Sequence, residues 1–202
     1  MAPAKILDRA FYERPTTQVA RELLGCHLVR TETVDGKSVR LSGIITETEA
    51  YCGETDLGCH AKAGRTPRTE VLYGPAGLAY VYFTYGMHWL LCAVTRPEGQ
   101  PEAVLIRAIQ PVEGIEVIAE RRGAQPEKLW TDGPAKLTRA LAIDGAHNGL
   151  DLTAPGAIIA IESGTSVPEN HVSVGPRIGL FTVPEPWKSK PWRYLATLPA
   201  SA

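Results

Sequence analysis

Hydrophobic and aromatic residues dominate positions 79–94 (AYVYFTYGMHWLLCAV), and this pattern predicts two β-strands joined at Tyr85-Gly86. Along the first strand Tyr80 and Tyr82 share one face, because side chains alternate across a strand. The turn would carry Tyr85 out of the sheet, where a bulky aromatic ring can wedge into a stack of flat rings. Aromatic strands are more often part of a hydrophobic core, so both interpretations stay open for this stretch viewed alone.

The rest of the chain alternates short strands, turns and short helices. Asp35-Gly36 predicts a hairpin turn, and glycines and prolines make residues 52–78 rich in loops. We therefore predict an α+β fold: one domain over residues 1–202, with a curved, largely antiparallel sheet, short flanking helices, a protruding β-hairpin and a loosely ordered lead-in at residues 1–9. Strands are expected at 26–32, 38–48, 103–109, 158–161 and 176–180, and helices near Thr16, from Pro111 to Arg122, and after a cap at Asp132.

One predicted strand carries two acidic residues on the same face. Glu47 and Glu49, together with Tyr51, point the same way if the strand at 38–48 continues past its expected end. Two carboxylates this close repel each other, and burying them together is costly. Arg107 lies within an apolar strand and needs a carboxylate partner if it is buried, for which Glu47 and Glu49 are the candidates. An exposed strand end with solvated acids is the structural alternative.

Composition narrows the class of protein. The chain has 202 residues, 44% of them apolar and 21% charged, which is typical of a globular protein. Its cysteines lack C-x-x-C spacing, so we expect free thiols in a reducing compartment and no zinc site. Because there is no H-E-x-x-H motif, no apolar signal core and no long apolar run, we expect no metal, no secretion and no membrane insertion.

Basic residues gather in two clusters although the formal net charge is −1. A slightly negative charge argues mildly against nucleic-acid binding, but the distribution of charge matters more than its total. A solvated surface is the common alternative for such clusters. The first contains Lys62, Arg65 and Arg68, and the second contains Arg121, Arg122, Lys128, Lys136 and Arg139.

Several segments match one enzyme family in order and spacing: ETEAY (47–51), the loop through His60 and Arg65-Thr66-Pro67-Arg68, YVY (80–82), YGM (85–87), VLIRA (104–108), GPAKL (133–137), RIG (177–179) and the terminal WRY (192–194). With them the chain resembles the alkyladenine (3-methyladenine) DNA glycosylases of the type first described in mammals. The resemblance runs from roughly residue 10 to residue 195, which is nearly the whole chain. It is therefore more specific than any single motif.

The resemblance implies a DNA repair enzyme that flips an alkylated or deaminated purine out of the duplex and hydrolyses its N-glycosidic bond, leaving an abasic site. In it, Glu49 corresponds to the general base that activates a water, and Arg107 and the backbone carbonyl of Ile178 correspond to groups that position this water. The flipped base would lie among aromatic groups, and another ring would fill the vacated gap. The residues that match these roles are Tyr51, His60 and Tyr82 around the base, and Tyr85 with Met87 at the gap.

The same resemblance implies double-stranded DNA with damaged purines as the partner. Segments that match DNA-contacting regions of the family contain Arg65, Thr66, Arg68, Arg122 and Lys136, with Arg121 and Arg139 as weaker candidates. No lysine matches a Schiff-base position, so we expect hydrolysis without strand cleavage. We expect no cofactor, a monomer, and a cytoplasmic, nucleoid location if the source is bacterial.

One position departs from the family pattern. Cys92 stands where the best-known members carry an asparagine that is thought to clash with the exocyclic amine of normal guanine. Cysteine is smaller and lacks the amide. We therefore expect a roomier base pocket that excludes purines with an N2 amine less strongly.

Two other functions stay open. A non-catalytic module that binds distorted duplexes would share the Tyr85 wedge and the basic clusters, but it would give Glu49 and Arg107 no task. A nucleoside hydrolase would use the carboxylate and the aromatic pocket, but it would need neither the wedge nor phosphate contacts.

Overall fold

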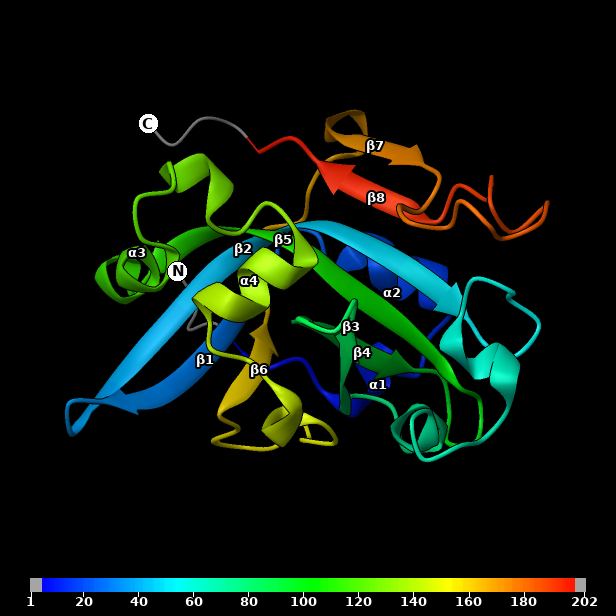
Figure 1. Cartoon of the computed structure of the whole chain (residues 1–202), viewed down its shortest axis with the longest axis horizontal. Coiled ribbons are helices and arrows are strands. Elements are labelled where there is room, and N and C mark those ends of the chain that lie inside the picture. The colour runs from blue at the N-terminus through cyan, green and yellow to red at the C-terminus, as the bar shows by residue number, and fades with distance from the viewer. Residues whose placement is uncertain (1–4, 199–202) are drawn as a thin grey trace.

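The computed structural model describes residues 5–198, and these form one α+β domain around a mostly antiparallel sheet. The sheet has eight strands: six follow the order β3-β4-β5-β2-β1-β6, while β8 pairs with β2 and β7 pairs with β8. Helices α1 and α2 lie on one side of the long β2–β5 pair, and α3 and α4 lie on the other (Figure 1). The predicted fold class is confirmed.

The helices are short and the strands vary widely in length. The helices are α1 (Arg9–Tyr12), α2 (Thr16–Glu22), α3 (Ile115–Arg122) and α4 (Pro134–Ala140), with short 3-10 turns between other elements. The strands are β1 (His27–Val34), β2 (Lys37–Cys52), β3 (Ala79–Thr84), β4 (His88–Thr95), β5 (Glu102–Glu113), β6 (Ile159–Glu162), β7 (Val172–Gly175) and β8 (Arg193–Ala196).

Strand β2 is the longest, with 16 residues, and it crosses the middle of the sheet. On one edge it pairs first with β1 and then, at residues 47–49, with β8. On the other edge it pairs with β5 from Ser42 to Cys52. Because neighbours flank both edges at residues 47–49, this part of β2 is buried although it carries two glutamates.

The β2–β5 ladder is irregular beside these glutamates. Ile45 pairs with Ile109, Glu47 with Ala108 and Thr48 with Ile106, so one extra residue on each strand is left out of the pairing. The extra residue on β5 is Arg107. A bulge of this kind re-aims a side chain and often lies beside a functional site, and here it turns the guanidinium toward the acidic pair.

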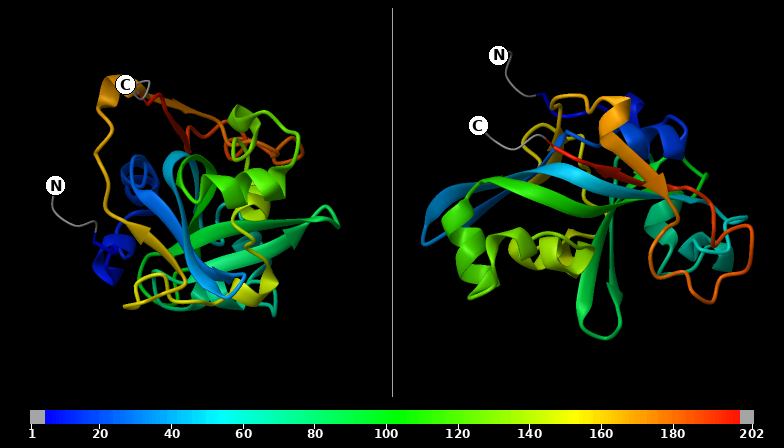
Figure 2. Two further views of the ribbon diagram at one scale, coloured as in Figure 1. Left: turned by 90° about the vertical axis from the view of Figure 1, so that its left-hand side faces the viewer. Right: turned by 90° about the horizontal axis from the view of Figure 1, so that it is seen from above.

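The β3–β4 hairpin protrudes from the body of the molecule, as Figure 2 shows for the green loop at its tip. Tyr85 (φ 51°) and Gly86 (φ 67°) both adopt left-handed backbone conformations, and the N–H of Met87 donates to the carbonyl of Thr84 at 3.2 Å. This is the primed type of turn that matches the twist of paired strands. The predicted hairpin and its turn are confirmed.

Two predicted element boundaries are wrong. Pro111 does not begin a helix, because β5 continues to Glu113 and α3 starts after Gly114, whose φ is 69°. Asp132 does not cap α4: Gly133 occupies that position, and the carboxylate of Asp132 instead accepts from Nζ of Lys136 at 2.8 Å.

The expected strand at 176–180 does not form. This segment is irregular, because the side chain of Arg177 is buried in an ion pair with Asp56, which holds the segment against the loop after β2. The nearby strands are β7, which ends at Gly175, and β8, which the sequence did not predict as a strand.

The start of the chain is attached to the sheet where it is described. Ile6 bridges to Glu162, and the N–H of Leu7 donates to the carbonyl of Ile161 at 2.8 Å. Of the lead-in predicted at residues 1–9, residues 1–4 lie outside the described part of the chain.

Candidate active site

An aromatic cavity of about 330 Å³ lies between one face of β3–β5, the loop through His60 and the segment around Ile178. Tyr80 and Tyr82 stack with ring centroids 5.2 Å apart, and His60 meets Tyr82 edge-on at 4.6 Å. The cavity is therefore a slot with flat apolar walls. Its lining also includes Tyr51, Tyr85, Cys92, Leu105, Arg107, Gly179 and Leu180.

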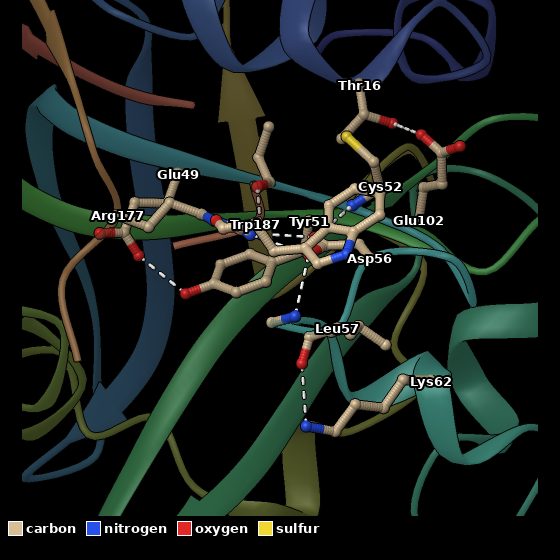
Figure 3. Close-up of polar contacts among 12 residues, drawn as sticks. Thr16, Glu49, Tyr51, Cys52, Asp56, Leu57, Lys62, Glu102, Arg177 and Trp187 are labelled. Carbon is tan, nitrogen blue, oxygen red and sulfur yellow. Dashed lines mark hydrogen bonds and ion pairs between the residues drawn. The ribbon is translucent and has the colours of Figure 1, made fainter. Parts of the chain in front are cut away.

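Glu49 lies directly behind this cavity, with an exposed fraction of 0%. The hydroxyl of Tyr51 donates to Oε2 of Glu49 at 2.8 Å (Figure 3). The backbone N–H of Ile178 donates to Oε1 at 2.6 Å. Nε of Arg107 lies 3.4 Å from the same Oε1. Glu49 does not itself line the cavity, but Tyr51, Arg107 and Ile178 all do. In this state its carboxylate is covered by cavity-wall residues.

Arg107 lies closer to Glu47 than to Glu49. Its Nε donates to Oε1 of Glu47 at 2.9 Å. Arg193, on β8, also donates to this Oε1. Both carboxylates are therefore partnered: Glu47 accepts from two guanidinium groups, and Glu49 accepts from a phenol and a backbone amide. The predicted partner of Arg107 was Glu49 or Glu47, and the structure places it against both.

Burial raises the pKa of Glu49 above its ordinary value, and the charge of Glu47 adds to this effect. Arg107, the N–H of Ile178 and the hydroxyl of Tyr51 oppose it, because each favours the ionised carboxylate. A carboxylate whose pKa is raised toward neutrality is a better proton acceptor than a free one.

A second buried ion pair supports the wall formed by Tyr51. Asp56 and Arg177 are both fully buried, and Nη2 of Arg177 donates to Oδ1 of Asp56 at 2.8 Å. The guanidinium of Arg177 lies 4.6 Å from the centroid of the Tyr51 ring, on which it packs (Figure 3). One side of the Tyr51 ring is thus covered by a cation, and this fixes the position of the ring.

His60 is neutral near pH 7. Burial, helped by the charges of Arg68 and Lys62, lowers its pKa to about 4. Its Nδ1 lies 3.0 Å from the hydroxyl of Tyr80. A neutral imidazole in the wall does not repel a cationic ligand, whereas an imidazolium would.

The mouth of the cavity carries exposed apolar side chains. Tyr85 is 80% exposed, and Met87 on the same hairpin is also exposed. Across the mouth, Ile178 is exposed, and Phe181, three residues further along the chain, is likewise 80% exposed. The site of a Cβ added at Gly179 would lie 3.9 Å from the hydroxyl of Tyr85, so the two sides of the mouth approach each other.

The candidate DNA-contacting residues lie on two sides of the hairpin. Arg122 and Lys136 line a groove of about 810 Å³ together with Met87 and Arg139. On the other side, Arg68 donates to the carbonyl of Phe83 at 3.1 Å. The other two candidates lie in the loop before the hairpin: Arg65 pairs with Glu70, and the Thr66 hydroxyl lies 3.0 Å from that of Thr69.

Comparison with known proteins decides the family. The family model for methylpurine-DNA glycosylase (MPG) matches residues 10–198. The chain belongs to the methylpurine-DNA glycosylase family. This confirms the resemblance found in the motifs, and membership implies a hydrolase that acts on bases of DNA in DNA repair.

Relatives from several bacteria carry the same name, "Putative 3-methyladenine DNA glycosylase". The one from Myxococcus xanthus (strain DK1622) is 48% identical over 187 residues, which cover 93% of this chain and 88% of that protein. The one from Carboxydothermus hydrogenoformans is 49% identical over 175 residues, covering 87% and 88%. The one from Streptomyces avermitilis is 46% identical over 190 residues, covering 93% and 86%.

In this glycosylase-family chain, the unusual cysteine lies on the floor of the cavity. Cys92 is buried on β4, where it pairs with Tyr80 on β3 and Leu105 on β5. Burial raises the pKa of its thiol well above the ordinary value, so the group is neutral. All four cysteines of the chain are free thiols in the structure.

Sequence reasoning missed part of this site. Tyr80 shares the aromatic face with Tyr82, and the strand alternation could have placed it in the wall. The Asp56–Arg177 pair joins residues 121 positions apart, and no local pattern indicates such a contact. Sequence reasoning assigned no role to the N–H of Ile178, although it donates to Glu49, and the expected role of its carbonyl stays a prediction.

Within residues 5–198, no group of three or more His, Cys, Asp or Glu side chains could hold a metal ion. No helix in the same part of the chain is long and apolar enough to cross a membrane.

Proposed function

We propose that the protein is a monofunctional DNA glycosylase that takes an alkylated purine into the aromatic cavity and hydrolyses its N-glycosidic bond with a water held by Glu49. The observation that supports this best is a fully buried carboxylate directly behind an aromatic slot, held by the N–H of Ile178 and with Nε of Arg107 at 3.4 Å. A surface carboxylate would be solvated, and burying one without a task is costly.

The cavity suits a flipped purine. Tyr51, His60 and Tyr82 offer flat groups on which a base can stack, and each stacked base gains about 1–3 kcal/mol. Aromatic faces also attract cations, and alkylation at a ring nitrogen gives a purine a positive charge. Because His60 is neutral near pH 7, it adds no repulsion.

The reaction needs one base and no metal. Glu49 takes a proton from the water, whose oxygen then bonds to C1′ of the sugar as the bond from C1′ to the purine nitrogen breaks. The purine leaves with the electron pair of that bond, so an alkylated cation departs as a neutral base without a general acid. The negative charge of Glu49 stabilises the oxocarbenium character that develops at C1′.

Access of water to Glu49 requires a small opening of the site. Tyr51, Arg107 and Ile178 separate the carboxylate from the cavity. Binding of a nucleotide that moves any of these three groups would let a water reach Glu49. The closed state protects the carboxylate until a substrate is bound.

Tyr85 and the basic residues would hold the duplex open around the cavity. The exposed ring of Tyr85 belongs to the turn of the β3–β4 hairpin and can fill the space that a flipped nucleotide leaves. Arg122 and Lys136 on one side of the hairpin, and Arg68 on the other, would contact phosphates, which gives affinity but little sequence preference.

The decisive experiment measures free base released from duplexes that contain 7-methylguanine, a cationic base that leaves without a general acid. Duplexes that contain the neutral bases hypoxanthine or ethenoadenine are measured beside them, and release from these should be slower. We expect release by the wild-type protein, and strand breaks only after alkali treatment, because no lysine is assigned to a Schiff base. Glu49→Gln should bind a lesion duplex within about twofold of wild type and lose roughly 100- to 10,000-fold in release rate, the usual range for a general base. Glu162→Gln, on β6 and paired with Arg40, is the matched control and should release base normally.

Other outcomes would favour the rival functions. Binding to lesion DNA without any base release would indicate a non-catalytic binding module. Faster turnover of free nucleosides than of duplex would indicate a nucleoside hydrolase. Full activity of Glu49→Gln would refute the mechanism while leaving the glycosylase activity in place.

A further inference from the structure

Glu47 accepts hydrogen bonds from two arginines, whereas within residues 5–198 Glu49 accepts none from an arginine. The side chain of Glu47 is almost fully buried, and a single oxygen, Oε1, accepts from both Arg107 and Arg193. Arg107 reaches this oxygen at 2.9 Å but is 3.4 Å from the nearest oxygen of Glu49. The shorter, hydrogen-bonded contact of Arg107 is therefore with Glu47.

The backbone explains this preference. Arg107 is the residue left out of the β2–β5 pairing, and its strand neighbour Ala108 pairs with Glu47. On the other edge of β2, Leu195 pairs with Glu47 and Arg193 pairs with Glu49. The two guanidinium groups thus approach Glu47 from opposite edges of β2.

Without Glu47, Arg107 would have one carboxylate left within reach. Its Nε would move onto Oε1 of Glu49, which already accepts from the N–H of Ile178. Both lone pairs of that oxygen would then be occupied, whereas Tyr51 occupies only one of the two on Oε2. The oxygen beside Arg107 and Ile178, two residues of the cavity wall, would then offer no acceptor to a water.

We propose that Glu47 is a positioning residue for base excision: it holds Arg107 away from Glu49, so that the second lone pair of Oε1 of Glu49 stays available to the attacking water. This inference rests on the proposed function. A guanidinium fixed at Nε has a fixed plane, and Arg107 lines the cavity, so Glu47 also orients its remaining donors toward the substrate side.

If the Glu47–Arg107 ion pair only stabilised the fold, its loss would not change how the release rate depends on pH. The pH profile of the release rate therefore distinguishes a positioning role of Glu47 from a purely structural one. Loss of the negative charge of Glu47, and closer approach of Arg107, would both lower the pKa of Glu49. The acidic limb of the profile marks protonation of Glu49, and it would therefore move to lower pH. The charged or titratable groups that face Glu49 are Arg107, Tyr51, Glu47, Arg193, Arg177, Tyr82 and Cys92.

The test compares Glu47→Gln with Tyr51→Phe in single-turnover release from a 7-methylguanine duplex at saturating enzyme. For Glu47→Gln we expect unchanged DNA affinity, a plateau rate lower by about tenfold or more, and an acidic limb at lower pH than in wild type. Tyr51→Phe removes a hydrogen bond that favours the ionised carboxylate, so its acidic limb should move the opposite way, to higher pH.

Two further variants complete the experiment. Glu162→Gln breaks an arginine–glutamate pair elsewhere in the sheet and should move neither the rate nor the limb. Glu47→Asp keeps the negative charge on a shorter side chain. It should lower the plateau rate while the acidic limb stays near its wild-type pH. This variant replaces Glu47→Gln in the test if Glu47→Gln does not fold.

An unchanged plateau rate and limb in Glu47→Gln, or a lower melting temperature with both unchanged, would overturn the inference and leave the proposed function standing. Absence of base release from the wild-type protein would overturn both.

Discussion

Cys92 sets the shape of the cavity floor at the scale of a single side chain. It is buried between Tyr80 and Leu105, and its thiol is smaller than the asparagine amide of the best-known family members. Cys92→Asn should therefore reduce release of 7-methylguanine, which carries an N2 amine, by about 10-fold or more relative to release of hypoxanthine, which has none. The measurement is the ratio of release rates on the two duplexes.

Stability must be followed in the same variant. A buried amide without a partner costs about 1–3 kcal/mol, and this cost would lower the melting temperature without changing the ratio of rates. Cys92→Ala is the control, because it enlarges the floor and adds no polar group, and its ratio should not fall. A Cys92→Asn variant with the wild-type ratio would show that this position does not select purines.

Single residues were predicted from the sequence to different extents. Glu49 and Arg107 could be found because a charge inside an apolar strand must be paired, and the structure places them in contact. The preference of Arg107 for Glu47 could not be found, because it depends on two bulges in the β2–β5 ladder. Asp56 and Arg177 lie in irregular segments, where no periodicity relates one side chain to another.

The β3–β4 hairpin is the element whose form most directly reflects its proposed task. Tyr85 is a β-sheet former held at φ 51°, a conformation that glycine adopts at lower cost, and its ring is largely exposed. Neither burial nor backbone preference favours tyrosine here. Strain of this kind is typical of positions retained for function.

Tyr85→Gly should separate stability from activity. Glycine relieves the left-handed strain and little burial is lost, so the melting temperature should stay the same or rise. Base release from duplex should fall by roughly 5- to 150-fold, which corresponds to the loss of about 1–3 kcal/mol of stacking. Tyr85→Phe keeps the ring and should stay near wild type, whereas a Tyr85→Gly variant with full activity would contradict the wedge.

Elements with a clear period were predicted well, and elements fixed by tertiary contacts were not. The alternation in residues 79–94 and the Asp35-Gly36 turn gave two correct hairpins. The prediction of a helix from Pro111 was wrong because a proline can lie near the end of a strand as well as begin a helix. Here Pro111 pairs with Gly43 near the end of β5. Residues 176–180 read as a strand from their composition, but the buried pair of Arg177 with Asp56 requires irregular backbone.

At the scale of the whole molecule, charge is separated although the net charge is −1. Arg122, Lys136 and Arg139 line one groove beside the hairpin, while the buried acids Glu47 and Glu49 are partnered by arginines inside the sheet. A nearly neutral chain can therefore present a basic surface to DNA. The total charge from the sequence hid this arrangement, because it counts buried and exposed groups alike.

Variants at Lys136 and Asp132 test whether this groove binds DNA. In the free protein the ammonium group of Lys136 lies 2.8 Å from Oδ1 of Asp132. DNA binding must exchange this contact for one with a phosphate. Asp132→Asn should therefore strengthen binding to normal and lesion duplexes alike, because it frees the lysine and removes a negative charge. Lys136→Gln should weaken both alike and reduce the slope of log affinity against log salt concentration by about 1.

The measurement is duplex affinity at several salt concentrations, with release rates at saturating enzyme recorded in parallel. Lys37→Gln, at the β1–β2 turn and the opposite end of β2 from Glu49, is the matched control and should leave the slope unchanged. Release at saturation should be the same in all three variants, because phosphate contacts hold the duplex and do not touch the reacting bond. A change confined to lesion DNA would instead place Lys136 at the flipped nucleotide, and equal slopes in Lys136→Gln and wild type would remove this groove from the DNA-binding surface.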